Sequence, residues 1–332
     1  MRLILLFTTL LAVTAFSQKI HTPAEVFEIM NKSAVSYSIE GLNHKVKAED
    51  QSQNLTFNEF YREEKNGELI VKHYKYWPEV SHQFKLAEES YNKGALKEAR
   101  AFYLKVLELD SSIYKVMTYI GQTYAEEGNT AEALKWYKKS IKKNFISYMS
   151  HWFLADLYYD LGKQDEAIIE ITIAHILNRN NPRIQASMDK ILKTKKIRRA
   201  NWEFIPQIQI DSLSVKEISI KAKGAWMGYA MNKALWKYEP GYRESMIGSS
   251  NAFATTEEKE CFVSLLTMLT KRDKKKDPSL QALDEAVKHN MTDEFIFYEI
   301  YLKQYPMIAY QLPLKMVRDI SNYVLNVRSG IK

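Results

Sequence analysis

The sequence predicts a mainly α-helical protein: a three-repeat helical solenoid with a capping helix, flanked by a small α+β N-terminal segment and a mostly helical C-terminal domain with one or two strands. Three observations predict it. The 332 residues include only 11 glycines and 8 prolines, and a chain with so few helix breakers suits helices. Small residues recur every 34 positions through the middle of the chain. Short alternating apolar segments on either side favour strands.

Composition limits the classes of function. Hydrophobic residues make up 46% of the chain, which is enough for two or three packed domains at this length. The net charge is +7, but acidic residues accompany the basic ones along most of the chain. We interpret the charge as a solvated surface and expect no nucleic-acid partner. The basic run 271–276, closed by Asp277-Pro278, is predicted to be a solvated loop.

Residues 1–17 predict a cleavable export signal. Arg2 precedes an apolar run from Leu3 to Ala15, and small residues stand third and first before a cleavage site between Ser17 and Gln18. The run is shorter than the roughly 20 residues of a membrane span, and we expect no transmembrane segment after cleavage. One cysteine permits no internal disulfide. We therefore expect an exported protein of a bacterial periplasm or outer surface, with envelope association left open.

Residues 18–79 are expected to form the α+β segment. Thr22-Pro23-Ala24-Glu25 has the pattern of a capping box with proline in the first turn, and predicts a helix to about Lys32. Residues 35–39 alternate like a strand. Asn66-Gly67 is a strong turn signal, so the residues on either side of it are expected to form a hairpin.

The centre of the chain repeats itself in units of about 80–113, 114–147 and 148–181. Each unit has a small residue early in its first half, a glycine at the middle and an alanine shortly afterwards. Small residues allow two helices to approach closely, and glycine can end a helix in the left-handed conformation. Pro182 to about Ile197 is predicted to be the capping helix, within a domain of residues 80–197.

These columns resemble the tetratricopeptide repeat, whose period is 34 residues. The second unit shows the resemblance best, with Gly121, Tyr124, Gly128, Ala133 and Tyr137. The resemblance covers about 100 residues and implies stacked helix pairs whose first helices line a concave groove for a protein or peptide partner. Carried onto this chain, the groove residues are Phe84, Glu88, Tyr91, Gln122, Glu126, Trp152, Asp156 and Tyr159.

Such an aromatic and acidic groove suits a partner with basic and apolar side chains. The alternative is that Phe84, Tyr91 and Trp152 pack against the flanking regions of the same chain.

Residues 198–332 resemble no family that we recognise. Strands are expected around Ile208–Ile210 and Val215–Ile220, and a helix from about Ala222 to Tyr238. Further helices are expected near 256–270, 278–289, 292–303 and 312–327. The aromatic stretch from 226 to 243 is either a core with salt-bridged edges or a ligand site. The candidate ligand residues are Trp226, Lys233, Trp236, Glu239, Tyr242 and Arg243.

The sequence contains no recognisable catalytic motif. Its seven histidines are not paired at metal-ligand spacing, and Cys261 is preceded by Glu257, Glu258 and Glu260, which disfavour a thiolate. We expect no catalytic residues, metal or cofactor. The leading hypothesis is a non-enzymatic scaffold. The alternatives are an enzyme, or a carbohydrate or envelope-polymer binder that uses exposed Trp226, Trp236 and Tyr242.

Overall fold

The computed structural model describes residues 20–48, 59–248 and 254–331, so the predicted export signal at 1–17 lies outside the described residues. The chain forms two compact units. The first unit consists of Met1–Asp50, Asn201–Glu299 and Ile331–Lys332, and the second of Gln51–Ala200 and Ile300–Gly330.

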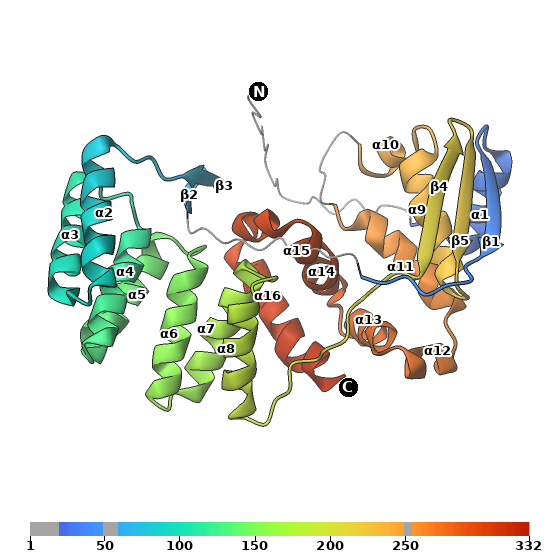
Figure 1. Cartoon of the computed structure of the whole chain (residues 1–332). Coiled ribbons are helices and arrows are strands. Elements are labelled where there is room, and N and C mark those ends of the chain that lie inside the picture. Colours follow the sequence, from blue (N-terminus) through green and yellow to red (C-terminus); the bar gives the residue numbers. More distant parts are fainter. Residues whose placement is uncertain (1–19, 49–58, 249–253, 332) are drawn as a thin grey trace. The chain divides into compact units, whose positions relative to one another are not determined.

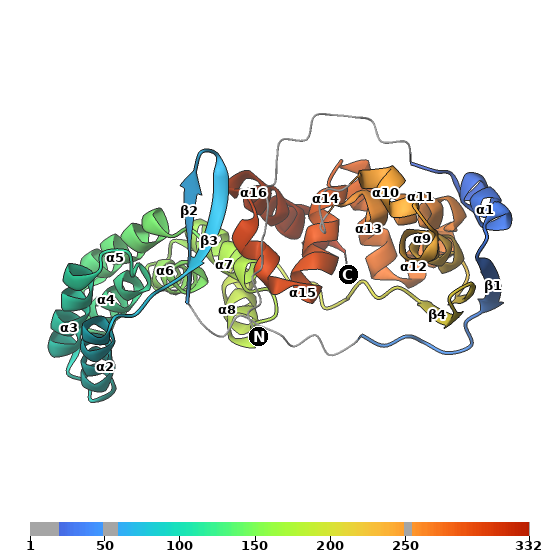
Figure 2. The same cartoon turned by 90° about the horizontal axis from the view of Figure 1, so that it is seen from above.

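The second unit is built around three antiparallel helix pairs and a capping helix, which follow one another in sequence order (Figures 1 and 2). The pairs are α2 (Pro78–Asn92) with α3 (Leu96–Leu109), α4 (Lys115–Glu126) with α5 (Thr130–Lys143), and α6 (Tyr148–Asp160) with α7 (Gln164–Leu177). The cap is α8 (Pro182–Lys193), which packs on α7 and begins with proline after an Asn181 N-cap. The predicted solenoid is confirmed.

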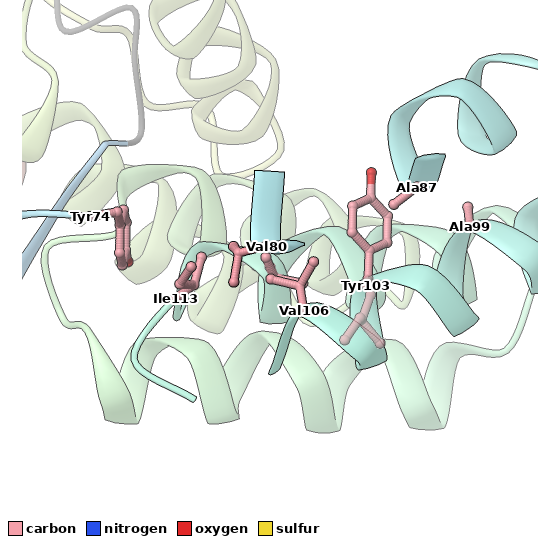
Figure 3. Close-up of a cluster of buried hydrophobic side chains, with 9 residues drawn as sticks. Tyr74, Val80, Ala87, Ala99, Tyr103, Val106 and Ile113 are labelled. Atoms are coloured by element: carbon pink, nitrogen blue, oxygen red, sulfur yellow. The ribbon is translucent and has the colours of Figure 1, made fainter. Parts of the chain in front are cut away.

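Small residues and glycines produce these pairs for the expected reasons. Gly94, Gly128 and Gly162 end the first helices with φ of 75°, 77° and 71°, a left-handed backbone that only glycine adopts cheaply. Ala87 and Ala99 are fully buried where α2 meets α3. They belong to a hydrophobic cluster that includes Tyr74, Val80, Tyr103, Val106 and Ile113 (Figure 3).

A hairpin and the C-terminal helices complete this unit. Strands β2 (Phe60–Lys65) and β3 (Glu68–His73) pair across Asn66-Gly67, whose φ values of 55° and 80° fit the predicted turn. Arg62 of β2 donates to the carbonyls of Tyr310 and Leu312 at 3.1 and 2.6 Å. The C-terminal elements are α15 (Leu302–Gln304), a 3-10 helix at Pro306–Gln311, and α16 (Leu314–Asn322) followed by a π-helical turn at Tyr323–Val327 and a 3-10 turn at Arg328–Gly330.

The first unit contains a three-stranded sheet in the order β1-β5-β4. Strand β1 (Ser36–Gly41) is parallel to β5 (Glu217–Ala222), and β4 (Ile208–Ser214) is antiparallel to β5. Helix α9 packs on β4 and β5, and helices α1 and α11 pack on α9. The helices are α1 (Pro23–Lys32), α9 (Trp226–Tyr238), α10 (Tyr242–Ile247), α11 (Thr256–Met268), α12 (Lys271–Lys276), α13 (Pro278–Lys288) and α14 (Thr292–Phe295), which continues into a π-helical stretch at Ile296–Tyr301.

The flanking regions differ from the expected division. The segment 18–79 does not stand alone, because β1 pairs with β5 of the C-terminal region while β2 and β3 belong with the repeats. Residues 300–330 also belong with the repeats, where α16 packs on α7. The loop predicted at 271–276 is wrong: Thr270 and Asp273 form a capping box that starts α12, and this satisfies amide groups that a helix start leaves unpaired.

Candidate partner-binding face and ligand pocket

Side chains of the first helices contact those of the next first helix or of the cap. We call the surface of these helices the first-helix face (α2, α4, α6 and the cap α8). Tyr91 of α2 donates its hydroxyl hydrogen to Glu126 of α4, and Gln122 Nε2 lies 2.5 Å from the Tyr91 oxygen. Ser187 of α8 donates to Asp156 of α6 at 2.6 Å. These hydrogen bonds join neighbouring helix pairs, and the third pair to the cap, and they hold the bonded side chains in place. The predicted groove residues belong to α2, α4 and α6.

At the first helix pair, the first-helix face is partly covered by other side chains of the protein. Phe84 packs against Tyr119 and Tyr76, with ring centroids 6.0 and 6.3 Å away. The Lys115 ammonium lies 4.8 Å from the Phe84 ring centroid and forms an ion pair of 2.6 Å with Glu59. Phe84 is therefore a packing residue, which contacts Tyr119 of the next helix pair and Tyr76 of the segment before α2.

The middle of the face is more open. Tyr91 and Gln122 are half-buried and Glu126 is exposed. Burial and the neighbouring Glu126 raise the pKa of Tyr91 far above its usual value, so its hydroxyl stays a hydrogen-bond donor at any working pH. Glu88 is also half-buried, and it accepts the hydroxyl hydrogen of Tyr103 from the second helix of its own pair.

The third helix pair contributes two half-buried aromatic side chains, Trp152 and Tyr159 of α6. The Lys190 ammonium of α8 lies 4.2 Å from the Tyr159 ring centroid, which is a cation–π distance. Burial raises the pKa of Asp156, and the hydrogen bond from Ser187 offsets part of that rise. The cap therefore extends the face beyond the third pair.

The first unit holds a pocket of about 500 Å³. It brings together three of the six candidate ligand residues, Lys233, Trp236 and Arg243. The remaining lining comes from three different elements, namely Ile208 and Ile210 of β4, Lys237 of α9 and Glu257 of α11. Lys233, Trp236 and Lys237 share one face of α9 because their spacing is three and four residues.

The other three candidates have structural roles. Trp226 is buried and packs on Phe204 at 5.3 Å between ring centroids. Glu239 accepts hydrogen bonds from Ser33 Oγ and Tyr37 Oη at 2.5 and 2.8 Å. Tyr242 is buried and donates to Glu260.

The idea of an exposed aromatic platform for sugars is wrong, because Trp226, Trp236 and Tyr242 are only 5%, 4% and 6% exposed. Trp226 and Tyr242 belong to the core of the unit, and Trp236 exposes only a small part of its ring to the pocket.

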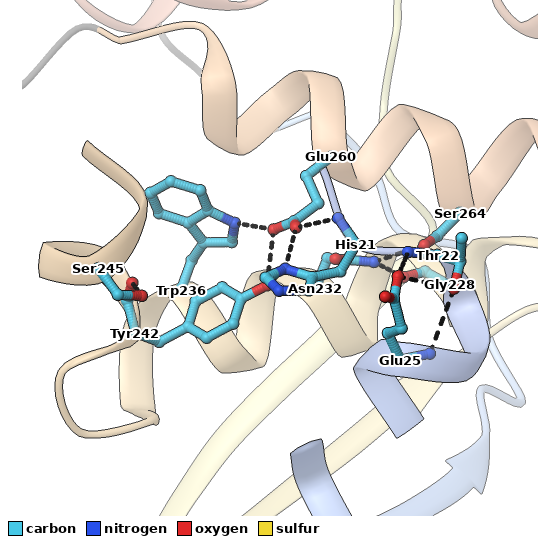
Figure 4. Close-up of polar contacts among 10 residues, drawn as sticks. All are labelled: His21, Thr22, Glu25, Gly228, Asn232, Trp236, Tyr242, Ser245, Glu260 and Ser264. Atoms are coloured by element: carbon cyan, nitrogen blue, oxygen red, sulfur yellow. Dashed lines mark hydrogen bonds and ion pairs between the residues drawn. The ribbon is translucent and has the colours of Figure 1, made fainter. Parts of the chain in front are cut away.

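Glu260 is a central polar residue that the sequence interpretation misses. Its buried carboxylate accepts from Trp236 Nε1 at 2.6 Å, from Tyr242 Oη at 3.0 Å and from the His21 amide at 2.9 Å (Figure 4). The side chain of His21 also lies 2.8 Å from Glu260. The only signal in the sequence is an acidic residue directly before the apolar run of α11. Its partners lie on α9, on α10 and just before α1, where no local pattern could reveal them.

Within residues 20–48, 59–248 and 254–331, no group of three or more His, Cys, Asp or Glu side chains is placed to hold a metal ion. Cys261 is buried, and burial raises the pKa of its thiol well above the usual value. No helix within these same ranges is long and apolar enough to cross a bilayer.

Three stacked helix pairs with an end cap define a repeat solenoid, a class of protein whose stacked helices present an extended binding surface. The family model for the tetratricopeptide repeat matches residues 83–113 and 114–142. The protein is therefore a tetratricopeptide-repeat protein, and this fold supports a scaffold for protein–protein interactions. The chain matches no curated protein.

Solved structures with some similarity cover the repeat region. The Yersinia enterocolitica type III secretion chaperone SycD, in complex with a peptide of the translocator YopD, is 17% identical over 36% of this chain and 98% of its own, with a TM-score of 0.34. The first repeat domain of Spaghetti (RPAP3), bound to an HSP90 peptide, is 17% identical over 35% and 93%, with a TM-score of 0.33. The Arabidopsis OM64 repeat domain is 13% identical over 35% and 95%, with a TM-score of 0.33. Because these scores are low, the assignment depends on the family model and on the helix pairs themselves.

Proposed function

We propose that the protein is an exported, non-enzymatic scaffold that binds a protein or peptide partner through its first-helix face. The observation that carries this proposal is that side chains of these helices contact one another across all three helix pairs and the cap. Aromatic rings and carboxylates on these helices remain partly or fully exposed to solvent. A face of this kind is long enough to hold an extended or helical peptide.

The chemistry of the face favours a particular partner. Glu126 and Asp160 are exposed, and Glu88 and Asp156 are half-buried. Carboxylates attract arginine and lysine, and the rings of Trp152 and Tyr159 offer apolar contact area at low entropic cost. We therefore expect a partner segment with basic and apolar side chains in alternation.

The test is a selection of random peptides on the full chain, followed by affinity measurements for the selected peptides. We expect them to be rich in arginine, lysine and large apolar residues. Glu126→Lys should weaken their binding about tenfold, since one reversed charge contact costs about 1.4 kcal/mol or more. Tyr159→Ala should weaken binding similarly through the loss of apolar contact.

The matched control is Glu108→Lys. Glu108 is also an exposed glutamate in the last turn of a helix, but that helix is α3, the second helix of its pair. Binding should be unchanged in this variant. Peptides that bind the Glu126→Lys and Tyr159→Ala proteins as tightly as the unmodified protein would contradict the proposed face. Phe84 is a poor choice for this test because it packs inside the repeat.

The export part of the proposal has a separate test. The charge, apolar run and small residues of 1–17 support cleavage before Gln18. Expression of the full chain in a bacterium, with fractionation and intact-mass measurement, should give a periplasmic or surface protein that begins at Gln18. An uncleaved protein in the cytoplasmic fraction would overturn this part and leave the binding face untouched.

A further inference from the structure

The pocket of the first unit has an apolar side formed by two elements. Ile208 and Ile210 are alternate residues of β4 and therefore point to the same face of the sheet. Trp236 of α9 also lines the pocket. Its indole nitrogen is already bonded to Glu260, and the Arg243 guanidinium lies 6.0 Å from its ring centroid. The ring therefore offers the pocket only apolar surface. An aromatic or branched aliphatic group fits such a surface.

The remaining lining of the pocket is mostly cationic. Lys233, Lys237 and Arg243 line it together with one carboxylate, Glu257. Glu257 is shared, since it lies 2.7 Å from Lys233 Nζ and 3.5 Å from Arg243 Nη1. The three cations thus outnumber the carboxylate that faces them.

Contacts with buried side chains hold one of these cations, Lys233, in place. Lys233 also forms an ion pair with Glu258, whose side chain is 5% exposed and which accepts from Tyr229 Oη at 2.6 Å. Although burial alone would lower it, the surrounding Tyr229, Glu258 and Glu257 hold the pKa of Lys233 well above its usual value. This ammonium is permanently charged and fixed in place.

The other two cations keep binding capacity. Among the residues that the structure describes, no carboxylate forms an ion pair with Lys237, whose ammonium lies 4.9 Å from the Tyr238 ring centroid. The single ion pair of Arg243, at 3.5 Å, is long and uses one corner of a planar group with five donors. A guanidinium of this kind matches the two oxygens of a carboxylate, sulfonate or phosphate.

We propose that this pocket binds a small organic anion, with an aromatic or branched apolar body against Ile208, Ile210 and Trp236 and its acidic group between Lys237 and Arg243. The volume of about 500 Å³ is in the range of small-molecule sites. This site lies within one compact unit and does not depend on the first-helix face or on any partner that the face binds.

The test is calorimetric titration of the full chain with naphthalene sulfonate and with the neutral naphthalene sulfonamide. The two probes share an apolar body and differ in charge. The sulfonate should bind at least tenfold more tightly, and its affinity should fall as salt is added, because the contacts are charged. Lys237→Gln and Arg243→Gln should each weaken sulfonate binding about tenfold and leave sulfonamide binding unchanged.

Lys276→Gln is the matched control, since Lys276 is an exposed lysine of the same unit in α12, outside the pocket lining. It should bind the sulfonate like the unmodified protein. Circular dichroism of each variant verifies folding, and the exposed Lys237 allows the test even if Arg243→Gln misfolds. Equal affinity for the two probes, no measurable binding, or full affinity in Lys237→Gln would each overturn the proposal.

Discussion

Gly121 of α4 lies so close to the ring of Tyr137 in α5 that a Cβ atom at Gly121 would be 2.6 Å from Tyr137 Cε1. Tyr137 is 2% exposed, so its ring is enclosed and cannot turn outward. The ring of Tyr137 therefore packs directly against the backbone of α4 at Gly121. The corresponding positions of the first and third pairs, Ala87 and Ala155, are alanines that are fully buried.

We expect Gly121→Ala to destabilise the repeat unit by up to about 2 kcal/mol. Alanine favours a helix by about 1 kcal/mol over glycine, but overpacking of an enclosed site costs about 1–3 kcal/mol. Urea unfolding of the full chain, followed by hydrogen exchange of the α4 and α5 amides, measures the difference. Gly330→Ala is the control, because a Cβ atom there meets no atom within 4 Å. A Gly121→Ala protein as stable as this control would show that the ring moves freely.

The sequence predicts the repeats well because their signal is local. Each small residue and each helix-ending glycine recurs at the same place, and the contacts they make lie within one pair or between neighbours. The pairing of β1 with β5 has no such signal. Ser36 and its partner Glu217 stand far apart in the sequence, on either side of the repeats, and an isolated alternating segment does not say which strand it will join.

The same limit applies to the pocket. Lys233, Trp236 and Arg243 come from one short stretch and were within reach of a sequence argument. Three other lining residues come from elsewhere in the sequence: Ile208 and Ile210 lie in strand β4, and Glu257 lies in helix α11. Aromatic content alone could not separate the lining residue Trp236 from the core residue Trp226, since both rings are equally apolar and only the packing decides.

Glu260→Gln should destabilise the first unit by about 2–4 kcal/mol. The substitution keeps the shape of the side chain but removes the charge from an acceptor of three hydrogen bonds, and it places an amide donor among other donors. Hydrogen exchange of α9 and α11 in the full chain measures the loss. Glu244→Gln, an exposed residue of α10, should have no effect. Unchanged protection in the Glu260→Gln protein would mean that the network adds no stability.

Cys261 should resist thiol reagents in the folded protein. It is fully buried in α11, and burial raises the pKa of its thiol, so both access and the reactive thiolate are lacking. At pH 8 we expect labelling by an aromatic disulfide to be at least a hundredfold slower than in denaturant. The urea-unfolded chain is the control for full reactivity. Rapid labelling under native conditions would contradict this burial.

His175 of α7 should make the repeat unit sensitive to acid. Burial, followed by the positive charges of Arg179, Arg199 and Arg328, holds the pKa of His175 well below its usual value. The unfolded chain takes up a proton near pH 6.5, whereas the folded chain does not. The unfolded state therefore binds more protons, and the stability that is present above about pH 6.5 is lost as the pH falls.

The measurement is hydrogen exchange of the α7 amides between about pH 7 and pH 5, corrected for the intrinsic pH dependence of exchange. The comparison protein is His175→Gln, which cannot take up this proton. Its absolute stability is lower if the glutamine packs poorly, but its dependence on pH should be flatter, because the proton uptake that favours unfolding is gone. The slope therefore separates the titration of His175 from the packing of its side chain. Parallel pH profiles in the two proteins would mean that other groups cause the sensitivity to acid.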